Sequence, residues 1–412
     1  MSNSKQFFTL QPVQDALSTL FEHITASQKT EIIPTIDSAG RVLALTVQSP
    51  IDLPAFDRSA MDGYAVRASD TFGASDALPA YLTLIGQVHM GEVPEFTVKQ
   101  GEVAVIHTGA MIPGGADAVV MIERTQQVND SEIEVLAPVA IGENIIKQGE
   151  DVSKDSEALS AGHVIRPQDI GGLLAVGITE IEVVQRPKIA ILSGGDELIE
   201  AHQTPELGQI RDINSHILAA LCQAAGAEVS IMGIATDSLE SLLSMAKEGF
   251  DNSDMLVLSA GSSVSVRDLT GEVINRLGEP GILQHGLAVK PGKPTIIAAC
   301  DGKAVIGLPG NPVSAMLVAR QVLLPVIHTL TAQKTTPQAT ISAILTENVA
   351  STSGREDTVP IRLHQTDNGY NAEPIRGKSN LIYTLLQANA LLHIPLNISG
   401  YTAGTTVEVT LF

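Results

Sequence analysis

The chain has 412 residues, a length that corresponds to roughly two to four domains, and 44% of its residues are hydrophobic. Aromatic residues make up 3% and Trp is absent, so the hydrophobic cores must be aliphatic. The formal net charge of −21 disfavours nucleic acid or an anionic membrane as a partner, because the protein would repel both. An anionic substrate is still compatible with this charge if a few placed cations, backbone N–H groups or a divalent metal bind it.

The N-terminal residues and the cysteines give no indication of export. Residues Met1–Leu10 lack the cationic and apolar segments of a signal peptide, and no apolar run is expected to reach the roughly 18 residues of a membrane helix. Cys222 and Cys300 stand in apolar surroundings, which predicts buried thiols rather than a disulfide or a metal site. The sequence therefore predicts a cytoplasmic enzyme or binding protein with no membrane partner.

The first half of the chain predicts one domain inserted into another. Apolar residues at helical spacing after Pro12 predict an amphipathic helix, and a strand is expected at Arg41–Val47. Between Tyr81 and Val139, short apolar runs separated by Gly and Pro predict a small β domain. We therefore expect an elongated domain formed by residues 1–50 and 140–185, interrupted by an inserted β domain at residues 51–139.

The second half changes rhythm at Arg186. Apolar runs at Lys188–Leu192, Val229–Ala235 and Met255–Leu258 alternate with helical patterns, which predicts a mostly parallel, doubly wound sheet. The tail Thr340–Phe412 returns to short strands with Gly and Pro turns and predicts a small β barrel or sandwich. We expect an α/β domain at residues 186–330 and a C-terminal β domain at residues 331–412.

Three loops of the α/β segment place Gly, and two of them also Ser, directly after an apolar strand. They are Ser193–Glu197, Ser259–Ser263 and Leu308–Pro312. Ligands of open parallel sheets bind beyond the carboxyl ends of the strands, where Gly permits close approach and N–H groups attract anions. Each loop alone is more simply an ordinary strand-to-helix turn, but three in one domain favour an edge that binds an anionic substrate.

Two kinds of charge accompany these loops. The segment Lys290–Pro294 reads KPGKP and holds two cations on a rigid turn, for which a solvated basic turn is the alternative. Carboxylates could together bind Mg²⁺, which prefers oxygen ligands and often bridges carboxylates to substrate phosphates. Each acid alone could instead serve in the first turn of a helix. The acids concerned are Asp196, Glu197, Asp237 and Asp268.

One segment outside the α/β domain is unusual. Residues Pro54–Ala65 combine two acids, Arg58, Ser59 and two aromatic residues, which is too polar for a core strand and too apolar for a free linker. An ordered interdomain loop is the simplest interpretation. His107–Ala110 and Gly149–Asp151 are most simply turns when each is read alone.

Together these segments resemble the molybdopterin molybdenumtransferase family, which comprises the MoeA proteins and the E domain of gephyrin. The resemblance covers nearly the whole chain, and the combination of motifs is specific although no single motif is. The matching segments are Pro54–Val66, Thr108–Glu123, Gly149–Val152, Gly195–Leu198, Ser259–Thr270, Lys290–Pro294 and Leu308–Ala315, with Asn389 and Ala403-Gly404…Val407 in the tail.

The resemblance implies four domains: an elongated one, an inserted β domain, a MoaB/MogA-like α/β domain and a C-terminal β barrel. It implies a homodimer whose active cleft lies between the α/β domain of one subunit and the MDGYA-bearing part of the other. It also implies the reaction, in which molybdate enters the dithiolene of adenylylated molybdopterin with Mg²⁺-dependent release of AMP. A separate molybdopterin adenylyltransferase and downstream molybdoenzymes would then be partners.

The resemblance also assigns roles to residues of this chain. Within the Ser259–Thr270 motif this sequence departs from the family pattern. Ala260–Ser265 replaces the Gly-rich loop that is usual in the family, although Asp268 keeps its spacing. The catalytic residues would be Asp62, Thr108, Asp151, Glu197 and Asp268, with Glu197, Asp237 and Asp268 as metal ligands. The substrate contacts would be Ser59, Gly195, Ser259, Gly261, Ser263, Lys290, Pro291, Lys293, Pro294, Pro309, Gly310, Asn311 and Pro312.

Other classes of function compete with this interpretation. A generic nucleotide-dependent phosphotransferase could use the same kind of sheet, but the chain has no GxxxxGK[ST] loop. A scaffold protein, or a pterin-binding protein that has lost catalysis, is the other alternative. Loss of catalysis predicts substituted acids, yet Asp62, Asp151, Glu197 and Asp268 are all present.

Overall fold

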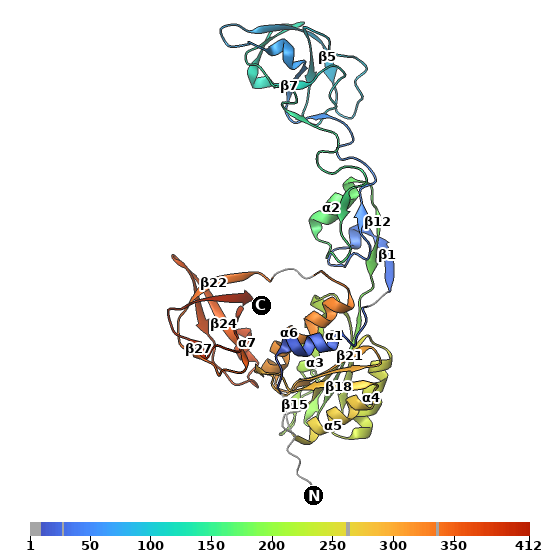
Figure 1. Ribbon diagram of the computed structural model, residues 1–412, viewed down its shortest axis with the longest axis vertical. Helices are drawn as coiled ribbons and strands as arrows, with labels where there is room; N and C mark the ends of the chain where they lie inside the picture. The colour runs from blue at the N-terminus through green and yellow to red at the C-terminus, as the bar shows by residue number, and fades with distance from the viewer. Residues whose placement is uncertain (1–9, 27–28, 261–263, 335–337) are drawn as a thin grey trace.

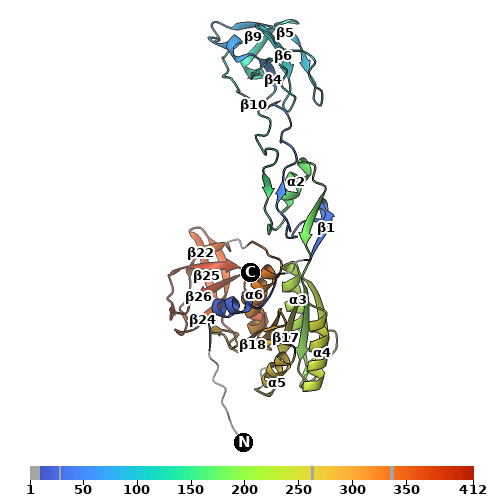
Figure 2. The same ribbon diagram turned by 45° about the vertical axis from the view of Figure 1, so that its right-hand side comes forward.

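The protein is elongated, with a β-rich head at one end and two compact units at the other (Figure 1). A narrow arm connects the two ends, and this arrangement is also clear after a 45° turn (Figure 2). In this computed structural model the described residues are 10–26, 29–260, 264–334 and 338–412, and the side chains of residues 260 and 264–268 are not described.

The α/β unit, called the body, contains a six-stranded sheet in the order β16-β13-β17-β21-β20-β18. The first four strands are parallel, as predicted, whereas β20 runs antiparallel to both of its neighbours, β21 and the edge strand β18. The central strands are buried on both faces because helices cover both sides, so they read as continuous apolar runs. The strands are β13 (Lys188–Gly194), β16 (Glu228–Ala235), β17 (Met255–Ala260), β18 (Pro280–His285), β20 (Ile296–Cys300) and β21 (Lys303–Pro309); the helices are α3 (Asn214–Ala224), α4 (Leu239–Asp251), α5 (Val264–Asn275) and α6 (Pro312–Leu330).

Helix α1 (Val13–Phe21) confirms the predicted amphipathic helix, but it packs on the body rather than on the arm. Its buried face, with Leu17 and Leu20, joins the same core as α6 and the sheet. Helix α6 is long and apolar enough to cross a membrane by length and composition, contrary to the sequence-based expectation that no such run exists. Because 61% of that stretch is buried inside the fold, its apolar character is explained by the core that it forms.

The arm combines segments from before and after the head. Strand β1 (Thr30–Pro34) pairs antiparallel with β12 (Glu180–Val184), and helix α2 (Pro167–Ala175) covers a small core that includes Leu43 and Leu173. Between the arm and the head, the outgoing and the returning segments of the chain lie side by side. Leu53 of one and Val152 of the other form an isolated antiparallel β-bridge.

The head is built on a six-stranded sheet in the order β7-β4-β6-β5-β9-β8. Strands β5 to β9 lie within or at the edge of the segment Tyr81–Val139 that was predicted to form a β domain. Strand β4 was missed by sequence reasoning, because it overlaps the polar MDGYA segment, yet all four of its residues are buried between β7 and β6. The strands are β4 (Gly63–Val66), β5 (Ala80–Val88), β6 (Glu102–Ile106), β7 (Ala118–Met121), β8 (Thr125–Asn129) and β9 (Glu132–Val135).

The C-terminal unit is a closed five-stranded barrel, which confirms the predicted β barrel. The ring runs β24-β25-β22-β28-β26 and closes through the pairing of β24 with β26. The short strand β19 (Val289–Lys290) of the body pairs in parallel with β24 and so joins the body to the barrel. The barrel strands are β22 (Thr340–Leu345), β24 (Glu356–Thr366), β25 (Gly369–Pro374), β26 (Ala390–Ile394) and β28 (Thr406–Leu411), and the short helix α7 (Tyr383–Leu386) lies beside them.

Candidate anion-binding site between the body and the barrel

A large pocket lies at the junction of the body and the barrel. Its volume is about 1200 Å³, somewhat larger than the roughly 300–1,000 Å³ of typical small-molecule pockets. Body residues from the segments 287–294 and 307–317 and barrel residues from the segments 348–360 and 374–384 line it, although the predicted contacts Gly310 and Pro312 do not. In Figure 1 this junction lies where α6 and α7 approach one another.

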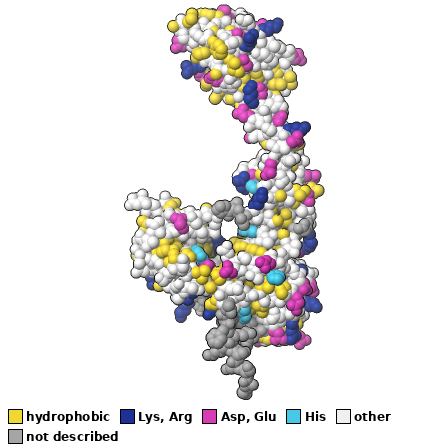
Figure 3. Space-filling model, viewed as in Figure 1, with side chains coloured by type: hydrophobic (Ala, Val, Ile, Leu, Met, Phe, Trp, Pro, Cys, Tyr) yellow, Lys and Arg dark blue, Asp and Glu magenta, His cyan; other side chains and the backbone are white. Residues whose placement is uncertain are grey.

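The pocket concentrates positive charge in an acidic protein. Among the described residues that line it, five carry a positive charge and one, Asp357, carries a negative charge. The surface outside it shows Asp and Glu interspersed with Lys and Arg (Figure 3). A concave site whose charged side chains are mainly cations attracts anions despite the overall charge of −21. The five cations are Lys290, Lys293, Arg355, Arg376 and Lys378.

The KPGKP turn is held rigidly at the floor of this pocket. Gly292 has φ +109°, and a Cβ there would overlap Cγ2 of Val318 on α6, so the position accepts only Gly. The backbone N–H of Leu287 donates to the carbonyl of Lys293 at 2.9 Å, and the Thr295 hydroxyl donates to the carbonyl of Gly292 at 2.7 Å. Both predicted lysines therefore project from a backbone that is already ordered, so the binding of an anion does not have to order it.

The LPGNP turn lies against the barrel. Asn311 donates from Nδ2 to Oγ of Ser379 at 3.0 Å, and the N–H of Val313 donates to the carbonyl of Ser379 at the same distance. Helix α6 begins at Pro312, which has no N–H, and the N–H groups of Val313 and Ala315 donate to Ser379 and Asn311. Ser314 lies in this first turn and lines the pocket.

A second polar cluster lies behind the LPGNP turn. Asn214, at the start of α3, donates from Nδ2 to Ser259 Oγ at 3.0 Å and to the carbonyl of Gly310 at 2.9 Å. Ser259 is only 3% exposed, so its hydroxyl supports the turn rather than facing a solvent-accessible ligand. The predicted contacts Gly261 and Ser263 lie outside the described residues.

The predicted metal-binding acids form a separate group at the ends of β13 and β16. The N–H of Asp237 donates to Oδ1 of Asp196 at 3.0 Å. Burial raises the pKa of Asp237, and the negative charges of Asp196 and Glu197 raise it further. At Gly195, with φ +153°, a Cβ would lie 2.7 Å from Oε2 of Glu197, so this turn also requires Gly.

These acids have the oxygen donors that Mg²⁺ prefers, and their mutual repulsion would be relieved by a cation. In the described part of the chain, however, no group of three or more His, Cys, Asp or Glu side chains converges on a possible metal position. The side chain of Asp268, the third expected ligand, is not described. Asp196, Glu197 and Asp237 do not line the cationic pocket.

The remaining predicted residues lie at the other end of the molecule. Thr108 donates its backbone N–H to Oδ1 of Asp62 at 2.8 Å, which lowers the pKa of that exposed carboxyl. His107 Nδ1 lies 3.6 Å from the same oxygen. Ser59 is fully buried and its hydroxyl donates to the carbonyl of Met61 at 2.6 Å, so it shapes the MDGYA segment from within.

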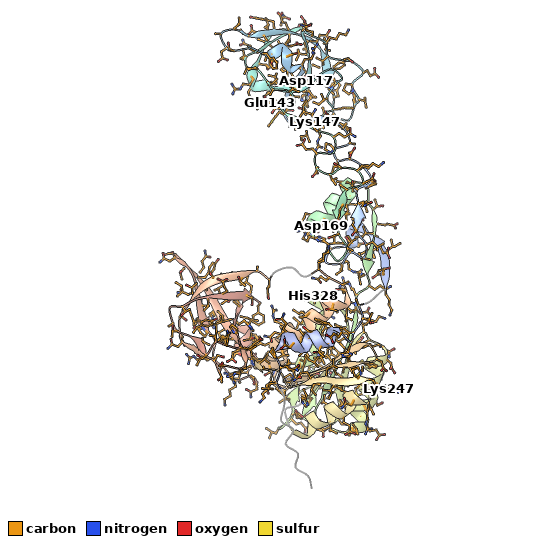
Figure 4. The ribbon with its side chains drawn as sticks, in the orientation of Figure 1. Asp117, Glu143, Lys147, Asp169, Lys247 and His328 are labelled. Carbon is orange, nitrogen blue, oxygen red and sulfur yellow. The ribbon has the colours of Figure 1, made fainter. Side chains whose placement is uncertain are left out.

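The distance between these two regions is plain in Figure 4, which labels Asp117 and Glu143 on the head and His328 on α6 at the base of the arm. Asp151 lies in the segment that returns from the head to the arm, where its N–H donates to the carbonyl of Leu53 at 3.0 Å. Within one chain, the head residues and the pocket therefore do not meet.

Sequence reasoning missed the contribution of the barrel to the pocket. Arg355, Arg376 and Lys378 stand beside Gly354 and Gly377, and cations next to Gly in an acidic chain are a pattern that could have been noticed. Two neutral donors, Ser314 and Ser379, were also missed because a single hydroxyl in a loop carries little information.

The fold and pocket define a class: a multidomain protein in which a parallel α/β unit and a β barrel together enclose an anion-binding pocket. Three family models match: MoeA N-terminal region (domain I and II) at residues 11–177, "Probable molybdopterin binding domain" at 190–329, and MoeA C-terminal region (domain IV) at 342–412. The chain therefore belongs to the MoeA family.

Named relatives agree with this assignment. A molybdopterin molybdenumtransferase of Staphylococcus aureus is 31% identical, with 97% of this chain and 95% of that protein covered. One from a Nostoc species is also 31% identical, over 96% of this chain and 93% of its own. The crystal structure of a molybdopterin biosynthesis MoeA protein from Pyrococcus horikoshii is 34% identical, with a TM-score of 0.83 over 98% of this chain and 100% of that one.

Proposed function

We propose that this protein is a molybdopterin molybdenumtransferase, which inserts molybdate into the dithiolene of adenylylated molybdopterin and releases AMP. The observation that carries the proposal is the pocket with five cations and one carboxylate in a chain of net charge −21. Relatives that match nearly the whole chain bear the name of this activity.

Molybdate is a tetrahedral dianion and needs several donors from different directions. The pocket supplies Lys290 and Lys293 from one side and Arg355 from the other, with the hydroxyls of Ser314 and Ser379 nearby. Charge-assisted bonds to such groups are stronger than neutral ones. The volume of about 1200 Å³ exceeds what one oxyanion fills, so part of a larger substrate fits beside it.

The acids at the ends of β13 and β16 would bind Mg²⁺, together with Asp268. The raised pKa of Asp237 supports this assignment, because burial, its main cause, and the negative charges of Asp196 and Glu197 both disfavour the ionised carboxylate, which a bound cation would favour. When bound, Mg²⁺ would stabilise charge that develops on the leaving phosphate. The chain itself contributes the fixed backbone at Gly195 that holds Glu197 close to Asp196 and Asp237.

A second copy of the chain would bring Asp62 and Thr108 to the pocket. Large apolar side chains are exposed on the arm, with Ile32 at 70%, Ile36 at 67% and Leu45 at 60%. Such exposed apolar residues favour an interface between proteins. We infer a homodimer in which the head of one subunit completes the cleft of the other. An adenylyltransferase would supply the substrate, and molybdoenzymes would receive the product.

Release of AMP from adenylylated molybdopterin, measured against molybdate concentration, tests the proposal. Lys293→Gln removes a pocket cation and should lower kcat/KM for molybdate by about 10-fold or more. Lys247→Gln, on the outer helix α4 and labelled in Figure 4, is the matched control and should behave as wild type. Wild-type kinetics in Lys293→Gln, or no AMP release by the wild type, would reject the proposed function.

A further inference from the structure

The single described carboxylate that lines the cationic pocket is almost completely buried. Asp357, at the start of β24, is 2% exposed. Its Oδ1 accepts from Nε of Arg355 at 2.9 Å, and its Oδ2 lies 3.7 Å from Nζ of Lys290. One carboxylate thus contacts a cation of the barrel and a cation of the body.

The backbone reinforces this arrangement. Lys290 and Asp357 are register partners in the parallel pairing of β19 with β24, and the N–H of Glu356 donates to the carbonyl of Ala288 at 2.7 Å. The carboxylate is therefore fixed at the seam between the two units. Because Nε of Arg355 is engaged, the planar guanidinium has its orientation set while its two Nη groups are left for another acceptor.

We infer that Asp357 is a positioning residue, which orients Arg355 and Lys290 to bind an oxyanion in the pocket. This inference rests on the proposed function and extends it. Asp357 does not touch the oxyanion, since like charges repel. It acts through the two cations, which would otherwise sample several side-chain conformations on either side of a large pocket.

Two accounts of Asp357 predict changes of opposite sign. If the carboxylate only balances charge, Asp357→Asn makes the pocket more positive and oxyanions bind more tightly. If the carboxylate positions the cations, the same substitution releases them and oxyanions bind less tightly in spite of the added positive charge. The sign of the change in affinity therefore separates the two accounts.

The chain offers a matched control in the arm. Asp169 is 7% exposed and contacts Arg166, with Nη2 to Oδ1 at 2.9 Å, and His163, with Nε2 to Oδ2 at 2.6 Å. Like Asp357, it is a buried acid between an arginine and a second basic group, but it does not line the pocket. Asp169→Asn controls for the general effect of removing a buried, paired carboxylate.

The test is calorimetric titration of the full-length protein with molybdate alone. We expect the Kd of Asp357→Asn to rise about 10-fold or more, whereas Asp169→Asn keeps the wild-type value. In an Arg355→Gln background, Asp357→Asn should raise the Kd for molybdate much less, because the guanidinium that Asp357 positions is absent. Equal or tighter binding by Asp357→Asn would overturn the inference, and so would equal weakening in both Asn variants.

A second variant covers the case in which Asp357→Asn does not fold. Asp357→Glu keeps the charge but moves the carboxylate by one methylene, so its Kd should rise several-fold. Wild-type affinity in Asp357→Glu would overturn the inference. If the wild type itself binds no molybdate, the proposed function fails; if it binds and the Asp357 variants match it, the inference alone fails.

Discussion

The pocket and the head differ in nearly every physical respect. The pocket is concave, rich in cations and enclosed by two rigid units, whereas Asp62 and Thr108 lie exposed on a β domain at the far end of the arm (Figures 1 and 4). In the proposed function the pocket binds the oxyanion. The exposed carboxylate of Asp62 does not line this pocket, so in that proposal it would reach the pocket from another copy of the chain.

The substitution Asp62→Asn separates the two regions most sharply. We expect a fall of about 100-fold or more in AMP release, typical of losing a group that acts on the reacting atoms, with the Kd for molybdate unchanged. Kinetics and calorimetry on the same preparation measure both. Asp130→Asn, an exposed acid elsewhere on the head, should leave both quantities unchanged. Weaker molybdate binding by Asp62→Asn would contradict the proposal that the pocket binds molybdate while the head acts only in the reaction.

The rigidity of the pocket floor can be tested with Gly292→Ala. Its Cβ would overlap Val318 at a positive φ, so we expect a loss of about 3 kcal/mol in stability and at least 10-fold weaker molybdate binding. Gly302→Ala, at φ +82° with no atom within 4 Å of the new Cβ, is the control for backbone strain alone. It should lose about 1 kcal/mol and keep its affinity. Equal effects in both variants would exclude the packing argument.

The sequence could predict the body side of the pocket but not the whole of it. Strand ends followed by Gly and by KPGKP and LPGNP indicate an anion site, since close backbone approach and cations are local properties. On the barrel side only the cations beside Gly354 and Gly377 give a local signal, and strand patterns do not say which end of a barrel meets another unit. Ser59 and Ser259 show a further limit, as their hydroxyls are used by Met61 and Asn214.

The arm should lose stability when Asp169 is replaced. Arg166 holds the pKa of Asp169 far below its ordinary value of 3.8, with His163 adding to the effect. Because the folded pKa is depressed, this contribution is fully present above the ordinary pKa of 3.8, decreases below it and is lost as the pH falls through the folded pKa. Denaturant unfolding should show a loss of about 2–3 kcal/mol for Asp169→Asn at neutral pH. The difference from wild type should shrink on acidification; a constant difference would contradict the linkage.

The smallest expected effect concerns Asp237. Its pKa is raised by burial and by Asp196 and Glu197, so its charge opposes folding once the pH rises through the folded pKa. Asp237→Asn should therefore raise Tm slightly at neutral pH in the absence of metal. Mg²⁺ should raise the Tm of the wild type more than that of the variant. Equal Mg²⁺ shifts in both proteins would argue against metal binding at these acids.

The most direct test of a shared cleft is co-expression of Asp62→Asn and Lys293→Gln subunits with different tags. Random pairing makes half of the dimers hybrid, and each hybrid has one cleft with an intact head and an intact pocket. At limiting molybdate the mixture should therefore release AMP at about a quarter of the wild-type rate, whereas Lys293→Gln alone should reach about a tenth of it or less and Asp62→Asn alone about a hundredth. A mixture no more active than the separate variants would contradict a cleft formed by two chains.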